Sequence, residues 1–354
     1  MRRSNQCALE IIAALAAWSA IAQTAPKTAL LALSKQYHTL IIVDPVDLHV
    51  LARIPVGDDP HEVVASADGK TAYVSNYGFG AFHTLTVVDL VAYKRLASID
   101  LGALRGPHGL VFELGKVWFT AEAAKAIGSY DPATGKIDWI MGTGQNRTHM
   151  LYVFPDGKRI VTTNVNSATV TILEEIEGRA GAPPPGPPGF GPPPGMPGFG
   201  PPPPPPGGDW QLTVIPVGRG AEGFDLSPDG KEAWVANARD GTISVIDIAQ
   251  KIVTATLDVN VPGANRLKFT PDGKKVLVTA GSALVILDVA TRKEVKRLAT
   301  VHGSGGIQMQ PDGARAYVAC APDGYVAVID LKTLEMVGHV DVRGPDGLAW
   351  AVRR

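Results

Sequence analysis

The sequence predicts an all-β protein, a seven-bladed β-propeller of four-stranded antiparallel blades whose ring is closed by N- and C-terminal strands sharing one blade. Two observations predict the blades. A Pro-Asp-Gly-Lys type of turn recurs along the chain, and so does an apolar, β-branched run that ends in an acid. The acids recur 41–45 residues apart, which is the length of one propeller blade, except for one interval of 73 residues that contains a proline-rich segment. A third observation, the pattern at the two chain ends, predicts how the ring closes.

The recurring turn is expected to join the first and second strands of a blade. Proline presets φ for such a turn, aspartate bonds to its own backbone, and glycine takes the left-handed conformation that closes a hairpin. The motif occurs at Asp68-Gly69-Lys70, Pro155–Lys158, Pro228–Lys231, Pro271–Lys274 and Pro311–Gly313.

The acid-terminated runs mark the third strand of each blade. They end at Asp44, Asp89, Asp131, Glu174, Asp247, Asp288 and Asp330. We interpret these acids as caps of the following turn rather than as functional groups, since a short carboxylate side chain accepts backbone N–H groups there.

One repeat shows the four strands clearly. Its predicted strands are Ala221–Ser227, Glu232–Asn237, Thr242–Ile248 and Ile252–Val259.

The chain ends predict ring closure. Three strands are expected near the N-terminus (Ala29–Ser34, Thr39–Asp44 and His49–Val56), and Gly347–Val352 reads as the innermost strand that this blade lacks. Joining them leaves no bare sheet edge.

The second strands carry a family signature. They contain Tyr73–Asn76, Val161–Asn164, Trp234–Asn237 and Tyr317–Cys320. With the turns above, they resemble the YVTN-repeat propeller family over nearly all of residues 23–354 outside the segment 181–208. The resemblance implies the fold and leaves the function open, because one fold serves many activities.

The N-terminus resembles an export signal. Arg2 and Arg3 precede the apolar stretch Ile11–Ala22, which ends in Ala20-Ile21-Ala22. We expect residues 1–22 to be a signal peptide and residues 23–354 to be one propeller domain, periplasmic or secreted. The apolar stretch is too short to span a bilayer, so no transmembrane helix is expected in the mature chain. Cys320 would then have no disulfide partner.

Composition narrows the function classes. The chain is 45% hydrophobic and 19% charged, which suits a large core, and its formal net charge is −1. A general nucleic-acid binder should be clearly basic, so no nucleic-acid partner is expected. We expect a monomer.

A proline- and glycine-rich segment, 181–208, interrupts the predicted connection between the third and fourth strands of one blade. Its composition predicts a disordered insert that leans to polyproline II. Two interpretations stay open. It is a tolerated surface insertion, or it binds an envelope or protein partner through Phe190 and Phe199.

Candidate ligand-binding residues gather where the innermost strands begin. His61, His108 and His149 hold equivalent positions in three consecutive blades, and Glu222 follows in the next. Arg147, Arg266 and Asp346 lie in the same segments, and we expect all seven at the mouth of the central channel. The group can be a hydrated polar lining or a site for a small molecule or protein. As a third alternative, His61, His108 and His149 can bind a divalent metal as cofactor.

One blade carries a second resemblance. Gly106–Leu110, Val117–Glu122 and Ile127–Gly135 resemble the repeats of streptogramin B lyases, which are also seven-bladed propellers. That resemblance implies a divalent metal and a histidine base that opens a cyclic depsipeptide by elimination, with His61, His108 and Glu122 as catalytic candidates. The chain departs from the family at Gly106, where the family has a further acid.

Two functions therefore remain open. One is an exported binding or interaction module with its site at the channel mouth. The other is a divalent-metal-assisted hydrolase or lyase, lactonases included. No nucleophile elbow, phosphate-binding loop or zinc-protease motif occurs to decide between them.

Overall fold

The computed structural model describes residues 26–176, 209–299, 301–303 and 305–353. The predicted signal peptide, 1–22, and the proline-rich segment, 181–208, lie outside these ranges. Within them, no helix combines the length and the apolar character needed to cross a membrane.

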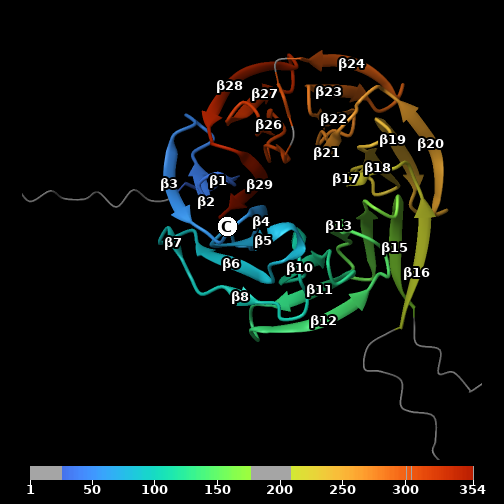
Figure 1. Cartoon of the computed structure of the whole chain (residues 1–354). Helices are drawn as coiled ribbons and strands as arrows, with labels where there is room; N and C mark the ends of the chain where they lie inside the picture. The colour runs from blue at the N-terminus through green and yellow to red at the C-terminus, as the bar shows by residue number, and fades with distance from the viewer. Residues whose placement is uncertain (1–25, 177–208, 300, 304, 354) are drawn as a thin grey trace, which may run out of the picture.

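Seven antiparallel sheets stand in a ring around a central channel, which confirms the predicted fold class (Figure 1). The first blade consists of β29 (Pro345–Val352), β1 (Thr28–Ser34), β2 (Thr39–Val43) and β3 (Val50–Pro55). The second contains β4 (Pro60–Ala65), β5 (Thr71–Asn76) and β6 (Thr84–Asp89), with the short strands β7 (Lys94–Arg95) and β8 (Ile99–Asp100) sharing its outer position. The third contains β9 (Pro107–Glu113), β10 (Lys116–Ala121), β11 (Ala126–Asp131) and β12 (Lys136–Gly142).

The remaining four blades follow the same order from the channel outward. The fourth contains β13 (Thr148–Val153), β14 (Arg159–Asn164), β15 (Thr169–Ile176) and β16 (Asp209–Pro216). The fifth contains β17 (Ala221–Leu226), β18 (Glu232–Asn237), β19 (Thr242–Asp247) and β20 (Ile252–Asp258). The sixth contains β21 (Ala264–Phe269), β22 (Lys275–Ala280), β23 (Ala283–Asp288) and β24 (Lys293–Leu298). The seventh contains β25 (Ile307–Met309), β26 (Arg315–Cys320), β27 (Tyr325–Asp330) and β28 (Glu335–Asp341).

The recurring turns have the predicted backbone. Gly69, Gly157, Gly230, Gly273 and Gly313 all have φ between 68° and 73°. The preceding aspartate accepts a backbone N–H two residues on, as Asp68 does from Lys70 at 3.0 Å. The turn chemistry therefore fixes where the first two strands of each repeat meet.

The acids after the third strands are turn caps, as predicted, in six of the seven blades. Asp44, Asp89, Asp131, Asp247, Asp288 and Asp330 each accept a backbone N–H from the following turn. Glu174 differs, because its carboxylate pairs with Lys251 of the next blade. Its strand β15 continues to Ile176 instead of turning.

The ring closes through both chain ends. β29 pairs with β1 from Thr28↔Val352 to Ser34↔Pro345. Leu30, Leu31 and Leu33 of β1 are fully buried as a result. The backbone N–H of Arg353 also donates to the carbonyl of Lys27 at 2.7 Å.

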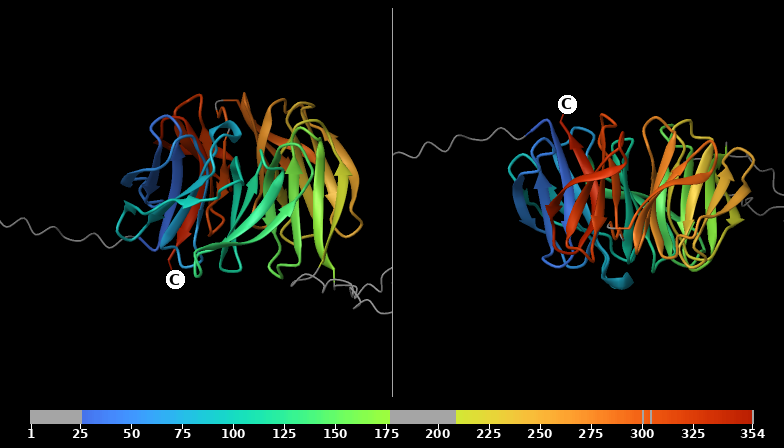
Figure 2. Two further views of the ribbon diagram at one scale, coloured as in Figure 1. Left: turned by 60° about the horizontal axis from the view of Figure 1, so that its bottom comes forward. Right: turned by 90° about the horizontal axis from the view of Figure 1, so that it is seen from above.

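The hydrophobic core lies between neighbouring blades, which stack face against face (Figure 2). Trp234 of the fifth blade is fully buried and meets Phe269 of the sixth edge-on, with ring centroids 5.5 Å apart. Each blade thus completes its core only against its neighbours, and the ring holds its innermost strands in fixed positions around the channel.

The strands that flank the proline-rich segment pair with each other. β15 and β16 run in register up to Ile176↔Asp209, so a two-residue turn can join them. We expect a chain in which Asn-Gly replaces residues 177–208 to keep the fold and gain about 2 kcal/mol of unfolding free energy, because each halving of a connection saves about 0.6 kcal/mol of closure entropy. Urea unfolding monitored by circular dichroism measures this. A loss of cooperative unfolding would contradict it.

Candidate ligand site at the channel mouth

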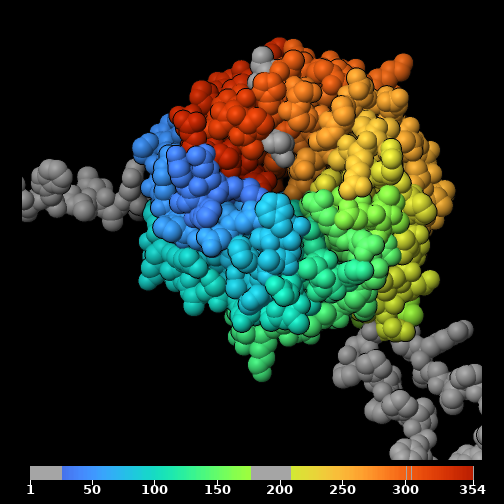
Figure 3. Space-filling view, in the orientation of Figure 1, coloured from blue at the N-terminus to red at the C-terminus, as the bar shows by residue number. Residues whose placement is uncertain are grey.

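The innermost strands bring the candidate residues together by a shared position. His61, His108, His149, Glu222 and Asp346 are each the second residue of an innermost strand, in β4, β9, β13, β17 and β29. All these strands start at the same face of the ring. Figure 3 shows this face, which is hollowed near its centre. Equivalent positions in separate blades therefore converge in space, as predicted.

Hydroxyl groups of the second strands hold the backbone of these residues. Ser75 donates to the carbonyl of His108 (3.0 Å) and Thr120 to that of His149 (2.8 Å). Thr163 donates to the carbonyl of Glu222 (2.6 Å). These hydroxyls occupy the third position of the Tyr-Val-Thr-Asn-like motif, so the repeat motif of one blade positions the site residue of the next.

Glycine after a site residue allows the innermost strands to approach closely. A Cβ atom on Gly109 would lie 2.6 Å from the carbonyl oxygen of His149, and one on Gly347 would lie 2.5 Å from that of His61. Any larger residue would push two neighbouring site residues apart.

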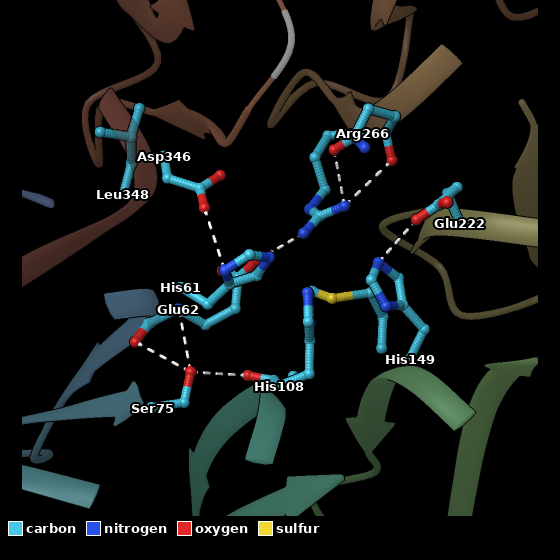
Figure 4. A network of polar contacts seen from close by, with 12 residues as sticks. His61, Glu62, Ser75, His108, His149, Glu222, Arg266, Asp346 and Leu348 are labelled. Carbon is cyan, nitrogen blue, oxygen red and sulfur yellow. Dashed lines mark hydrogen bonds and ion pairs between the residues drawn. The ribbon is translucent and has the colours of Figure 1, made fainter. Parts of the chain in front are cut away.

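A pocket of about 240 Å³ opens at the mouth. It is bordered by all seven ligand-site residues predicted from the sequence and by four others, the full set being Lys35, His61, His108, Arg147, His149, Glu222, Asn265, Arg266, Ala321, Pro345 and Asp346. In Figure 4 the three histidines and Glu222 point from their separate blades toward this space.

His149 lies between two carboxylates. Its Nδ1 donates to Glu122 Oε1 at 2.5 Å, and its Nε2 lies 2.7 Å from Glu222 Oε2 in an ion pair. Burial alone would lower the pKa of His149, but the two carboxylates outweigh burial and raise it. The same pairing lowers the pKa of Glu222 to about 2 against the cost of its burial. The group is a buried imidazolium flanked by two anions.

Arg147 and Tyr77 complete this side of the pocket. The Tyr77 hydroxyl donates to Glu122 Oε2. The Arg147 guanidinium lies 3.5 Å from Glu122 Oε2 and 3.5 Å from Glu222 Oε1, so it balances both carboxylates.

His108 lies between the other two histidines. Its ring centroid is 4.3 Å from that of His61 and 3.8 Å from that of His149. The side chain is fully buried, and neither ring nitrogen has a hydrogen-bond partner in the described part of the chain. Burial, together with the nearby positive charges, holds the pKa of His108 well below its ordinary value. Its imidazole is therefore neutral at pH 7.

A second group of charged residues borders the side of the pocket opposite His149. Lys35 Nζ lies 2.5 Å from His61 Nδ1, 2.8 Å from Asp59 and 3.5 Å from Asp346. The Lys35 ammonium group donates a hydrogen bond to His61 Nδ1. Burial raises the pKa of Asp346 despite its cationic neighbours.

An ion pair spans the channel beneath the pocket. Arg266 of the sixth blade donates to Glu62 of the second at 2.6 Å (Figure 4). Arg266 also borders an inner cavity of about 370 Å³ that residues of all seven innermost strands surround. The Arg266–Glu62 pair thus lies at the boundary between the mouth pocket and the inner cavity.

The structure adds residues that the sequence analysis did not assign to the site, chiefly Lys35, Asp59 and Glu62, and it gives Tyr77 a defined role. The sequence contains a signal for two of these residues, Lys35 and Tyr77. The residue directly after the second strand is Lys35, Tyr77 or Glu122 in the first three blades, whereas the other four have Val165, Ala238, Gly281 and Ala321. Polar residues at this position therefore mark the three blades whose second strands end beside the site.

Three donor groups lie close enough to hold a metal ion. One donor atom each from His108, Glu122 and His149 lies within 4.8 Å of the others. This set contains Glu122 where the sequence-based hypothesis has His61, although all three histidines border the pocket.

Comparisons with known proteins show the fold alone. No family model and no curated protein matches the chain. Among solved structures, a functionally unknown protein from Desulfotomaculum acetoxidans is similar at 12% identity and a TM-score of 0.70, covering 92% of this chain and 99% of its own. A proposed 6-phosphogluconolactonase from Bacteroides fragilis has 16% identity and a TM-score of 0.67, with 91% and 97% covered. Kuenenia stuttgartiensis hydrazine synthase has 17% identity and a TM-score of 0.63, with 85% and 91% covered.

Proposed function

We propose that the protein is an exported, monomeric propeller of the YVTN-repeat type that binds a small polar ligand at the channel mouth. The N-terminal export pattern supports a periplasmic or secreted location. Binding modules commonly place their ligand in a concave pocket with a few convergent polar groups, and the mouth pocket has this form.

One observation carries the proposal. The two ring nitrogens of His108 are buried at the edge of a pocket of about 240 Å³ and have no hydrogen-bond partner among the described residues. A buried polar group left unpaired costs about 1–3 kcal/mol, so a ligand that pairs with this ring recovers that energy.

The charges around the pocket indicate the kind of ligand. Lys35, Arg147 and Arg266 are cationic, while Glu222 and Asp346 supply acidic groups. Because both signs line the space, it suits a small polar molecule with both hydrogen-bond donors and acceptors.

The test is a thermal-shift screen of residues 23–354 with small polar metabolites, followed by calorimetry on each stabilising compound. A ligand at 100 times its Kd is expected to add about 2.7 kcal/mol of unfolding free energy. His108→Ala should abolish this gain, whereas His339→Ala, on the outer strand β28, should keep it. Finding no stabilising compound, or one that binds His108→Ala unchanged, would contradict the proposal.

The second candidate function is a divalent-metal-assisted hydrolase or lyase. The clustered donors of His108, Glu122 and His149 favour it, and His61, His108 and Glu122 follow the lyase-like layout. A structural neighbour is a proposed 6-phosphogluconolactonase, so lactones and cyclic depsipeptides are the substrates we would assay first. Metal-dependent turnover that His108→Ala removes would favour this candidate over simple binding.

A further inference from the structure

We propose that a first-row transition-metal ion binds at the channel mouth, held by His108, Glu122 and His149, with an open coordination position facing the pocket. The inference rests on the proposed function, because the ion would lie in the same ligand pocket. The ion would then form part of the surface that the ligand contacts.

The donor geometry is the first argument. The three donor atoms lie within 4.8 Å of one another. Metal bonds of about 2.1 Å in a tetrahedral site separate donors by roughly 3.4 Å, so modest side-chain rotations suffice. The backbone on which these side chains stand is fixed, because Ser75 and Thr120 hold the carbonyls of His108 and His149.

The unpaired nitrogens of His108 are the second, independent argument. The side chain is fully buried, and both nitrogens lack a hydrogen-bond partner within the described residues. Buried polar atoms left without hydrogen bonds are unusual, and here both belong to one side chain that borders the pocket.

The groups around the donors fit a metal centre. Ligating carboxylates are themselves hydrogen-bonded in metal sites, and Glu122 accepts a hydrogen bond from Tyr77. Arg147 lies 3.5 Å from Glu122 and from Glu222. A bound divalent ion takes the place of the proton between His149 and Glu122. The ion, the two carboxylates and Arg147 then sum to one positive charge. The open position therefore favours an anionic group of the ligand, such as a carboxylate.

The donor types select the class of metal. Two imidazoles and one carboxylate suit zinc, iron, cobalt, nickel or copper. Magnesium and calcium prefer six or more oxygen ligands, which this set does not offer. Three protein ligands also leave room for a water or a substrate group.

The test uses untagged residues 23–354, treated with a chelator, dialysed and titrated with Co²⁺, Zn²⁺ and Mg²⁺ by calorimetry and visible spectroscopy. We expect one Co²⁺ or Zn²⁺ per chain, d–d absorption bands of a low-coordinate Co²⁺ site, and much weaker Mg²⁺ binding. His108→Ala should reduce Co²⁺ affinity by more than about 100-fold, since even outer-shell changes cost 10–100-fold. Loss of that ring breaks no hydrogen bond in the described structure, and circular dichroism checks the fold.

Matched histidine variants separate this donor set from the alternatives. His339→Ala should bind the metal as the parent chain does, and His61→Ala should lose much less affinity than His108→Ala. Absence of stoichiometric binding, unchanged affinity in His108→Ala, or an equal loss in His61→Ala would overturn the proposal. The chelator-treated protein can also bind a ligand without metal. If His108→Ala abolishes that binding while no metal binds, the proposed function stands and the metal site is wrong.

Discussion

Glu222→Gln is expected to lower the unfolding free energy by about 3 kcal/mol at pH 7, because it leaves the buried His149 imidazolium with one carboxylate instead of two. The folded-state pKa of Glu222 is about 2, against 4.5 for an ordinary glutamate. A shift of that size corresponds to about 3 kcal/mol of stability. Urea unfolding at pH 7 measures the deficit.

The pH dependence gives the same prediction a second readout. Because the pKa of Glu222 is lowered on folding, its contribution is fully present above about pH 4.5 and is lost as the pH falls toward 2. The stability curves of parent and Glu222→Gln should therefore converge in acid. Glu335→Gln is the control, since its exposed pair with Lys296 is worth less than about 1 kcal/mol. A Glu222→Gln deficit that stays constant down to pH 2 would show that the ion pair is not its source.

Deleting residues 345–354 is expected to abolish cooperative folding. The deletion removes β29, the innermost strand of the first blade, and with it Leu348, which is 2% exposed, and the buried Ala349 and Ala351. It also bares β1 as a sheet edge. Burial of each large apolar side chain contributes about 1.5–3 kcal/mol, and the lost pairing adds to this, against a total stability of about 5–15 kcal/mol.

Soluble yield, size-exclusion chromatography and thermal unfolding by circular dichroism measure that effect. The matched control is the chain in which Asn-Gly replaces residues 177–208, which loses more residues but keeps every described strand. A peptide covering residues 343–354, added to the truncated chain, should partly restore folding. A truncated chain that unfolds cooperatively near the parent midpoint would contradict the expected role of ring closure.

The repeat pattern predicted most of the fold because each signal is local. Strand β18, Glu232–Asn237, has the predicted bounds, and β19 and β20 end one residue earlier than expected. Turn glycines and capping aspartates act within a few residues of themselves, so the sequence contains all that fixes them. Glu174 is the exception, since its partner Lys251 belongs to another blade.

The convergence of the candidate residues was predictable from the sequence, but the way they pair was not. Residues that share a position in the repeat must converge at the channel, which placed His61, His108 and His149 beside one pocket. Which acid pairs with which histidine depends on side-chain directions across three blades. The contact of Glu122 with His149 rather than with His108 of its own blade is of this kind. The ion pair between Glu62 and Arg266 spans the channel, and no sequence spacing encodes it.

The pairing of β1 with β29 also sets an order of events in folding. β1 precedes all other described strands in the chain and β29 follows them, so this contact has the largest sequence separation among the described strands. Contacts of such long range form late, since a long loop must close first. Until then the leucine-rich edge of β1 stays open to other chains, a hazard typical of incomplete sheets. Mispairing at this edge is therefore a risk until β29 is in place.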